Sequence, residues 1–190
     1  MFLFSISKPP ISRSGEAARV QLVEISAQPW AYLGCRAGTG AGQVSAMLET
    51  MHDAVLARVR KASLLARGPA RARFLYLKGE EVGFDIGIPI APGEALAAQA
   101  IGMRTGFTYS GPALRTTHAG PHAGLGDAYA QMEIRLASEG LDICGSVWEI
   151  YLNGVDVTAS DDLRTEILWP CRSRRRPNDT SDSHARPFEG

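Results

Sequence analysis

Three short sequence words recur in the same order in the two halves of the chain, and this repetition constrains the fold more than any other feature. Each pair shares its character: a basic residue before Ala-Gly, a Tyr-Leu pair before a glycine, or an apolar residue before proline. The pairs are Arg36-Ala37-Gly38 with His118-Ala119-Gly120, Tyr76-Leu77-Lys78-Gly79 with Tyr151-Leu152-Asn153-Gly154, and Ile88-Pro89 with Trp169-Pro170. Such self-similarity predicts two copies of one supersecondary unit. We expect halves at residues 20–90 and 99–171.

Hydrophobic periodicity in the first half predicts a strand, a helix and two further strands. Residues 20–34 have a strand-like pattern around Pro29. From Val44 onward, apolar residues recur at spacings of three and four, which is typical of an amphipathic helix, and Gly68-Pro69 ends it. Strands are then expected at residues 73–78 and 82–90.

The second half repeats this order. Strands fit residues 99–107 and 113–118, and a helix fits residues 125–138, with Gly140 as its stop. A hairpin within residues 146–170 closes the unit. The sequence therefore predicts an α+β fold of duplicated strand-helix-strand-strand modules, related by a pseudo-twofold axis, with a ligand cleft where they meet.

The closing hairpin contains two acids in otherwise apolar strands. Side chains alternate across a strand, so Glu149 shares one face with Tyr151, while Trp148 lies on the other. Glu166 occupies a similar position in the return strand. A carboxylate is costly to desolvate, so each acid is expected to face solvent, a partner or a ligand cavity. The pattern alone leaves these alternatives open.

The words E-I-Y-L-N-G, at residues 149–154, and D-L-R-T-E-I-L-W-P, at residues 162–170, resemble the closing hairpin of the GyrI-like small-molecule-binding domain. That family includes effector-binding domains of AraC-type and MerR-type multidrug-sensing activators, and free-standing domains similar to the gyrase-inhibitory protein. The resemblance covers residues 20–171. It implies two strand-helix-strand-strand modules with a binding cleft between them.

The resemblance also implies which residues bind a ligand. In the drug-sensing relatives, acids matching Glu149 and Glu166 lie in an aromatic pocket for bulky, often cationic compounds. A desolvated carboxylate favours a cation, and aromatic faces add cation–π attraction. His122 stands where many relatives have tyrosine. The expected ligand-binding residues are Glu149, Tyr151, Glu166, Tyr76 and His122.

Two functions follow from this resemblance. The first is a free-standing binding domain that senses or sequesters bulky apolar compounds, including cationic ones. The second is a hydrolase of cyclopropanoid electrophiles, because some relatives open such rings with the pocket glutamate and an aromatic side chain. Glu149 and Tyr151 would then be catalytic. The residues leave open whether the chain is an enzyme.

Other ligand classes find little support in the sequence. No cofactor is expected, because the glycines between Gly38 and Gly42 lack the spacing of a nucleotide-binding motif. No metal site is expected either, since Gly120 and Pro121 prevent His118 and His122 from sharing a helical face.

Composition limits the kinds of binding partner and the cellular location that we expect. The formal net charge is +0, and no apolar run approaches the roughly 20 residues that span a bilayer, so neither direct DNA binding nor membrane insertion is expected. The three cysteines do not form a disulfide framework, which favours a cytoplasmic location. A gyrase or a separate regulator as partner rests on the family name alone.

The ends of the chain differ in composition from its centre. Residues 1–19 read as a disordered leader without the features of a signal peptide. Residues 172–190 begin with an arginine cluster and continue with polar residues and proline, which is typical of a disordered tail. Residues 20–171 are therefore the expected binding domain.

Overall fold

The computed structural model describes residues 19–40, 42–75, 81–153 and 159–174. Three short 3₁₀ turns, at Pro92–Glu94, His122–Gly124 and Ser160–Asp162, accompany the regular elements. The helices and strands are β1 (Gln21–Ile25), β2 (Pro29–Gly38), α1 (Gln43–Lys61), β3 (Arg71–Leu75), β4 (Glu81–Pro89), α2 (Ala95–Ala100), β5 (Arg104–Phe107), β6 (Gly111–Ala119), α3 (Leu125–Glu139), β7 (Leu141–Ile143), β8 (Val147–Tyr151) and β9 (Arg164–Ser173).

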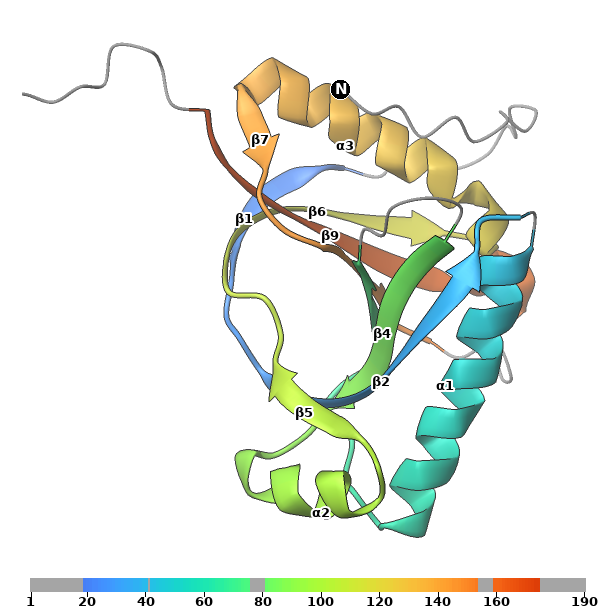
Figure 1. Cartoon of the computed structure of the whole chain (residues 1–190). Coiled ribbons are helices and arrows are strands. Elements are labelled where there is room, and N and C mark those ends of the chain that lie inside the picture. Colours follow the sequence, from blue (N-terminus) through green and yellow to red (C-terminus); the bar gives the residue numbers. More distant parts are fainter. Residues whose placement is uncertain (1–18, 41, 76–80, 154–158, 175–190) are drawn as a thin grey trace, which may run out of the picture.

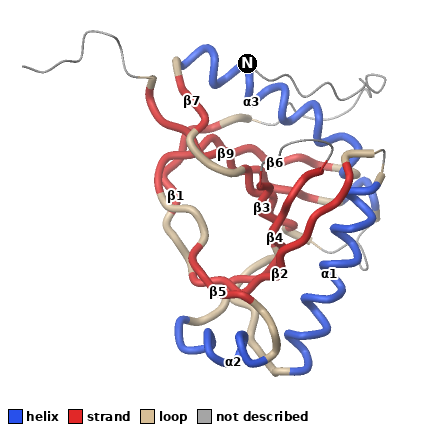
Figure 2. The backbone as a smooth tube through the Cα atoms, viewed as in Figure 1, coloured by secondary structure: helices blue, strands red, loops and turns tan. Residues whose placement is uncertain are grey.

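The strands form a curved antiparallel sheet in the order β1-β6-β9-β8-β3-β4-β2-β5, with β7 paired to β9. Helix α1 packs against β2 and β4, and α3 packs against β6. Both helices lie on the outer side of the curve (Figure 1, Figure 2). We call the helix-covered side the outer face and the opposite side the inner face. This arrangement confirms the α+β class.

The two long helices lie where the periodicity predicts them. Helix α1 begins one residue before Val44 but ends at Lys61, before the predicted stop at Gly68-Pro69, and α3 spans Leu125–Glu139. Gly140 follows α3 with φ of 62°, a left-handed conformation that glycine adopts without steric cost. None of the helices in the described ranges combines the length and apolar character needed to cross a bilayer.

The predicted strand at residues 99–107 is partly wrong, because Gln99 belongs to helix α2 and strand β5 begins only at Arg104. Alanine has the highest helix propensity, and α2 reads ALAAQA. Glu94 fixes the start of this segment, since its carboxylate accepts hydrogen bonds from the backbone N–H of Ala91 at 2.8 Å and of Leu65 at 3.1 Å. Local helical preference therefore overrides the strand that the repeat suggested.

The return strand of the closing hairpin is longer than expected. β9 passes through Pro170 and continues to Ser173, and its last residues pair with β7, which the sequence pattern did not indicate. Proline has no backbone N–H for the ladder. Pro170 is tolerated because it lies between the pairing of β9 with β8, which ends at Leu168, and the pairing with β7, which begins at Cys171.

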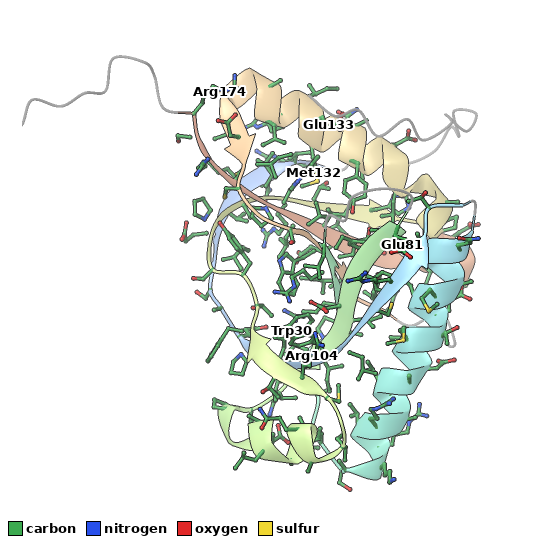
Figure 3. The ribbon with its side chains drawn as sticks, in the orientation of Figure 1. Trp30, Glu81, Arg104, Met132, Glu133 and Arg174 are labelled. Carbon is green, nitrogen blue, oxygen red and sulfur yellow. The ribbon has the colours of Figure 1, made fainter. Side chains whose placement is uncertain are left out.

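Two apolar cores lie on the outer face of the sheet, and a smaller apolar cluster lies on the inner face. Met132 is fully buried on the sheet-facing side of α3 (Figure 3). The core under α1 contains Ala31, Val55, Val59, Leu64, Ile86, Ile88, Ile90, Ala98 and Met103. The core under α3 contains Leu114, Leu125, Ala128, Met132, Leu136, Leu141, Ile167 and Cys171. The inner face has a smaller cluster of Trp30, Trp148, Ile150 and Leu168.

Gly87 is a point of close approach between two strands. It pairs with Tyr32 of β2, and a Cβ at Gly87 would lie 2.0 Å from the carbonyl oxygen of Ala31. Because backbone cannot yield as a side chain can, we expect Gly87→Ala to lower the free energy of unfolding by about 1–3 kcal/mol or more. Urea denaturation measures this loss.

Gly126 provides the matched control for Gly87. It lies in the first turn of α3, and nothing is within 4 Å of the Cβ that alanine would add. Gly126→Ala should raise stability by up to about 1 kcal/mol, because alanine favours a helix. Equal effects of the two substitutions would contradict the close approach at Gly87.

Candidate functional site

Glu149 lies at the centre of β8, on the outer face of the sheet. Its neighbours across the strands are Ala72 of β3 and Ile167 of β9, both fully buried. The Glu149 residue itself is only 6% exposed. We call the pairing of β3 with β8, which joins the two halves of the sheet, the seam. A single carboxylate is therefore buried at the seam, beneath the helices.

Two tyrosines satisfy this carboxylate. The hydroxyl of Tyr129, in α3, donates to Glu149 Oε1 at 2.8 Å, and the hydroxyl of Tyr151 donates to Oε2 at 3.2 Å. Tyr129 packs against the core under α3, whereas Tyr151 packs against the core under α1. Glu149 thus links the two cores through one phenol from each, which compensates part of its desolvation.

Burial raises the pKa of Glu149, and the hydrogen bonds from Tyr129 and Tyr151 oppose that rise. Burial, together with the nearby carboxylate, also raises the pKa of both tyrosines well above their usual value. The phenols therefore remain protonated and act as donors. The carboxyl group holds its proton to a higher pH than an exposed glutamate does. A cation bound nearby would stabilise its ionised form.

This raised pKa predicts a pH-dependent stability. The folded protein binds the Glu149 proton more tightly than the unfolded chain, so this group lowers stability as pH rises from its ordinary pKa of 4.5 through the raised value. Glu149→Gln removes that contribution and keeps the side-chain shape. We expect the difference in unfolding free energy between variant and unmodified protein to grow with pH over this interval in urea titrations. A difference that stays constant would contradict the raised pKa.

His122 lies beside the tyrosine that covers the carboxylate. Its ring centroid is 5.5 Å from that of Tyr151, and the residue is exposed. Burial against the protein lowers the pKa of His122, the neighbouring His118 lowers it further, and Glu49 of α1 raises it. His122 is therefore predominantly neutral at pH 7, and it lies beside Tyr151, one of the two tyrosines that donate to Glu149.

The structure does not bring Glu166 to this site. Glu166 pairs with Ile150 in the register of β8 and β9, whereas Glu149 pairs with Ile167, so the two acids project from opposite faces of the sheet. Glu166 instead lies 3.9 Å from Arg115 on the inner face. The expectation of two acids in one cleft fails because their positions in the paired strands differ by one residue. Tyr76 lies outside the described residues.

Access to Glu149 requires side chains to move. A cavity of about 400 Å³ lies between the end of β2 and the start of α1, and another of about 180 Å³ lies on the inner face. Neither of these two cavities is lined by Glu149. Because Glu149 is only 6% exposed and two phenols donate to it, close contact with a ligand requires a tyrosine to move.

Tyr129 is the site residue that the sequence analysis missed. It lies in α3, at helical spacings of four and three residues from the buried Leu125 and Met132. A buried phenol needs a hydrogen-bond partner. A tyrosine on the buried side of a helix could therefore have indicated a polar partner in the sheet. Within the described ranges, no group of three or more His, Cys, Asp or Glu side chains is arranged to hold a metal ion.

Comparison with known proteins was informative only at the level of structure. No protein-family model matches the sequence, and sequence comparison with curated proteins found no match. The C-terminal domain of EcmrR superposes with a TM-score of 0.66 at 17% identity, covering 84% of this chain and 100% of that domain.

Two further structures share the fold. A hydrolase from Listeria innocua has a TM-score of 0.58 at 10% identity, covering 81% of this chain and 92% of the hydrolase. SAV2435 bound to tetraphenylphosphonium has a TM-score of 0.52 at 13% identity, covering 81% of this chain and 94% of SAV2435. Identities this low establish the fold alone. The chain therefore has the GyrI-like fold that its closing hairpin predicted.

Proposed function

We propose that the chain is a small-molecule-binding domain for bulky aromatic cations, with Glu149 as the charged group of the site. One observation carries this proposal: an isolated carboxylate is buried at the seam, held by one phenol from each side. The related fold of SAV2435, which was determined with tetraphenylphosphonium bound, supports the ligand class.

The chemistry of the surroundings favours a cation. Once ionised, Glu149 has two phenols as hydrogen-bond donors, and among the described residues none of its hydrogen-bond partners carries an opposite charge. A bound cation supplies that charge in a poorly hydrated place, where the attraction is stronger than in water. The rings of Tyr129, Tyr151 and Trp169 can add cation–π contacts, since Trp169 packs edge-on against Tyr129 with centroids 5.9 Å apart.

We also propose that the two halves are copies related by a pseudo-twofold axis through the seam, with the ligand cleft beside it. The order β6-β9-β8 on one side repeats β2-β4-β3 on the other. The shift of 75 residues from Tyr76 to Tyr151 also carries Arg73 to Trp148, and these two are register partners. The same shift carries Phe74 to Glu149, so only one half contributes an acid.

We propose that Tyr151 and His122 open to admit the ligand. Tyr151 makes the longer of the two hydrogen bonds to Glu149, at 3.2 Å, and its ring contacts the exposed His122. Tyr129 makes the shorter hydrogen bond, at 2.8 Å, and also packs edge-on against Trp169. Under this proposal residues 20–171 form the binding domain, and the pairing of Ser173 with Leu141 extends its last strand by two residues.

A pair of ions with one shape and opposite charges tests the proposal. Isothermal titration with tetraphenylphosphonium should give saturable binding, while tetraphenylborate should bind at least about tenfold more weakly, because the buried carboxylate repels it. Equal affinities would show that shape and apolar contact alone select the ligand. Absence of tetraphenylphosphonium binding would overturn the proposed ligand class.

A hydrolase is the second candidate. A carboxyl with a raised pKa is a stronger base than an exposed one, and Tyr151 can supply a proton to a leaving carbon or oxygen. The Listeria innocua hydrolase shares the fold. If this candidate is correct, the protein should convert an electrophilic cyclopropane to its ring-opened, water-added product over many turnovers, and Glu149→Gln should lower the rate about 10²–10⁴-fold. Binding without turnover across several such compounds would exclude it.

A further inference from the structure

The inner face of the sheet has a second cluster of aromatic and charged side chains, away from Glu149. The guanidinium carbon of Arg73 lies 5.5 to 5.6 Å from the ring centroids of Trp30, Tyr32 and Trp148. Trp30 stacks on Tyr32 with centroids 4.4 Å apart. Register places Arg73 opposite Trp148, on the face that Glu149 does not share.

Asp85 holds the Arg73 side chain but does not use all of its donors. Nε and Nη2 of Arg73 both donate to Asp85 Oδ2, at 3.1 and 2.5 Å. Within the described part of the chain, Nη1 has no hydrogen-bond partner, and the side chain is 28% exposed. The guanidinium is therefore fixed in orientation with one nitrogen still available.

Gly34 leaves the space that this arrangement needs. A Cβ at Gly34 would lie 2.8 Å from Asp85 Oδ1 and 3.7 Å from Arg104 Nη1. Asp85 Oδ1 and Arg104 Nη1 thus both lie near Gly34, so Arg104 is a second guanidinium in the neighbourhood of the Arg73–Asp85 pair. The local charge is positive, which favours an anion.

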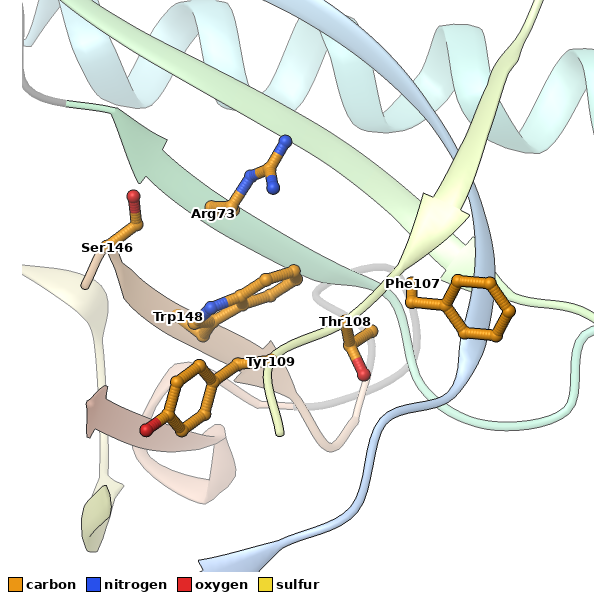
Figure 4. A pocket seen from close by; sticks show the side chains of 6 residues that line it. All are labelled: Arg73, Phe107, Thr108, Tyr109, Ser146 and Trp148. Atoms are coloured by element: carbon orange, nitrogen blue, oxygen red, sulfur yellow. The ribbon is translucent and has the colours of Figure 1, made fainter. Parts of the chain in front are cut away.

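A cavity of about 180 Å³ opens beside this cluster, lined by Arg73, Phe107, Thr108, Tyr109, Ser146 and Trp148 (Figure 4). Thr108 and Tyr109 come from the connection between β5 and β6, opposite the strands that carry Arg73 and Trp148. The Thr108 hydroxyl already accepts the Gln28 N–H at 2.9 Å, so its proton is free to be donated. Tyr109 is occupied, because its hydroxyl donates to the carbonyl oxygen of Pro112 at 2.9 Å.

The available polar groups of this cavity are therefore donors. They are Arg73 Nη1, the Thr108 hydroxyl and the Ser146 hydroxyl, which makes no hydrogen bond to any described residue. Phe107 is 69% exposed, and its ring points away from the other lining side chains (Figure 4). A guanidinium with an available N–H group matches a carboxylate, and the rings of Tyr109 and Trp148 match a planar apolar group.

We propose that this inner-face cavity is a second binding site, which takes small carboxylates carrying a single aromatic ring. The volume sets the size, because it is below the roughly 300–1,000 Å³ typical of drug-sized ligands. Arg73 binds the carboxylate through Nη1, and the ring of the ligand contacts Tyr109 and Trp148. The two faces of the sheet thus select ligands of opposite charge.

Benzoate and its neutral analogue benzamide test this site in the full chain. The indole N–H groups of the three tryptophans serve as reporters in nuclear magnetic resonance. Trp30 and Trp148 are on the inner face, whereas Trp169 packs with Tyr129 on the outer face. Benzoate should shift the Trp148 signal saturably and leave that of Trp169 unchanged. Benzamide should bind at least about tenfold more weakly, since it lacks the charge.

The double variant Arg73→Gln/Asp85→Asn removes both charges together, so neither is left buried alone. It should weaken benzoate binding at least about tenfold and change tetraphenylphosphonium affinity less than about twofold, because the outer-face site is separate. Failure of benzoate to shift Trp148 in the unmodified protein up to about 10 mM would overturn the proposal, whether or not the variant folds. Competition between benzoate and tetraphenylphosphonium, or equal binding of benzamide, would also overturn it.

Discussion

Glu149→Gln is expected to weaken tetraphenylphosphonium binding by about 10- to 100-fold, which corresponds to about 1.4–3 kcal/mol. Glutamine retains the shape of the side chain. Its amide can accept a hydrogen bond from one phenol and donate to the other, so the contacts with Tyr129 and Tyr151 persist. The loss then measures the charge of the carboxylate, which at 6% exposed is poorly screened by water.

Tetraphenylborate and Glu166→Gln are the matched controls for that substitution. Glu149→Gln should strengthen binding of the borate or leave it unchanged, because a repelling charge has been removed. Glu166 lies on the inner face, beside Arg115, so Glu166→Gln should alter tetraphenylphosphonium affinity by less than about twofold. A parallel loss for both ions in Glu149→Gln would mean that the substitution disturbs the shape of the site.

Arg73→Met is expected to lower the free energy of unfolding by about 3–5 kcal/mol. The Asp85 side chain is only 5% exposed and receives two hydrogen bonds from Arg73, so methionine leaves a buried charge without this partner. Urea denaturation at pH 7 measures the loss.

The double variant Arg73→Gln/Asp85→Asn should recover most of this stability, because two neutral amides can hydrogen-bond to each other without a buried charge. Similar instability in the single and double variants would show that the stacking of Arg73 on Trp30, Tyr32 and Trp148 matters more than its pairing with Asp85.

The sequence predicted those parts of the fold that local patterning determines. Apolar spacing located α1 and α3, because the residues on the buried face of a helix recur every three or four positions. Gly140 marked the end of α3. Alternation along β8 placed Glu149 and Trp148 on opposite faces, as the structure has them. The resemblance in the closing hairpin led to the correct fold.

Features that depend on pairing between distant segments could not be predicted from the sequence. The register of β8 with β9 decides that Glu166 faces away from Glu149, and a shift by one residue reverses the outcome. Contact between Tyr129 and Glu149 depends on how α3 packs across the sheet. The charged cluster of Arg73, Asp85 and Arg104 joins three strands, none of which carries a motif on its own.

A crystal structure of the protein with tetraphenylphosphonium shows directly where a cation binds. We expect the phosphonium on the outer face between α1 and α3, against the Glu149 carboxylate, with Tyr151 and His122 moved from their present positions. Tyr129 should remain in contact with the ligand or with Glu149. A phosphonium bound elsewhere, with Glu149 still buried under both tyrosines, would show that Glu149 is not the charged group of the site.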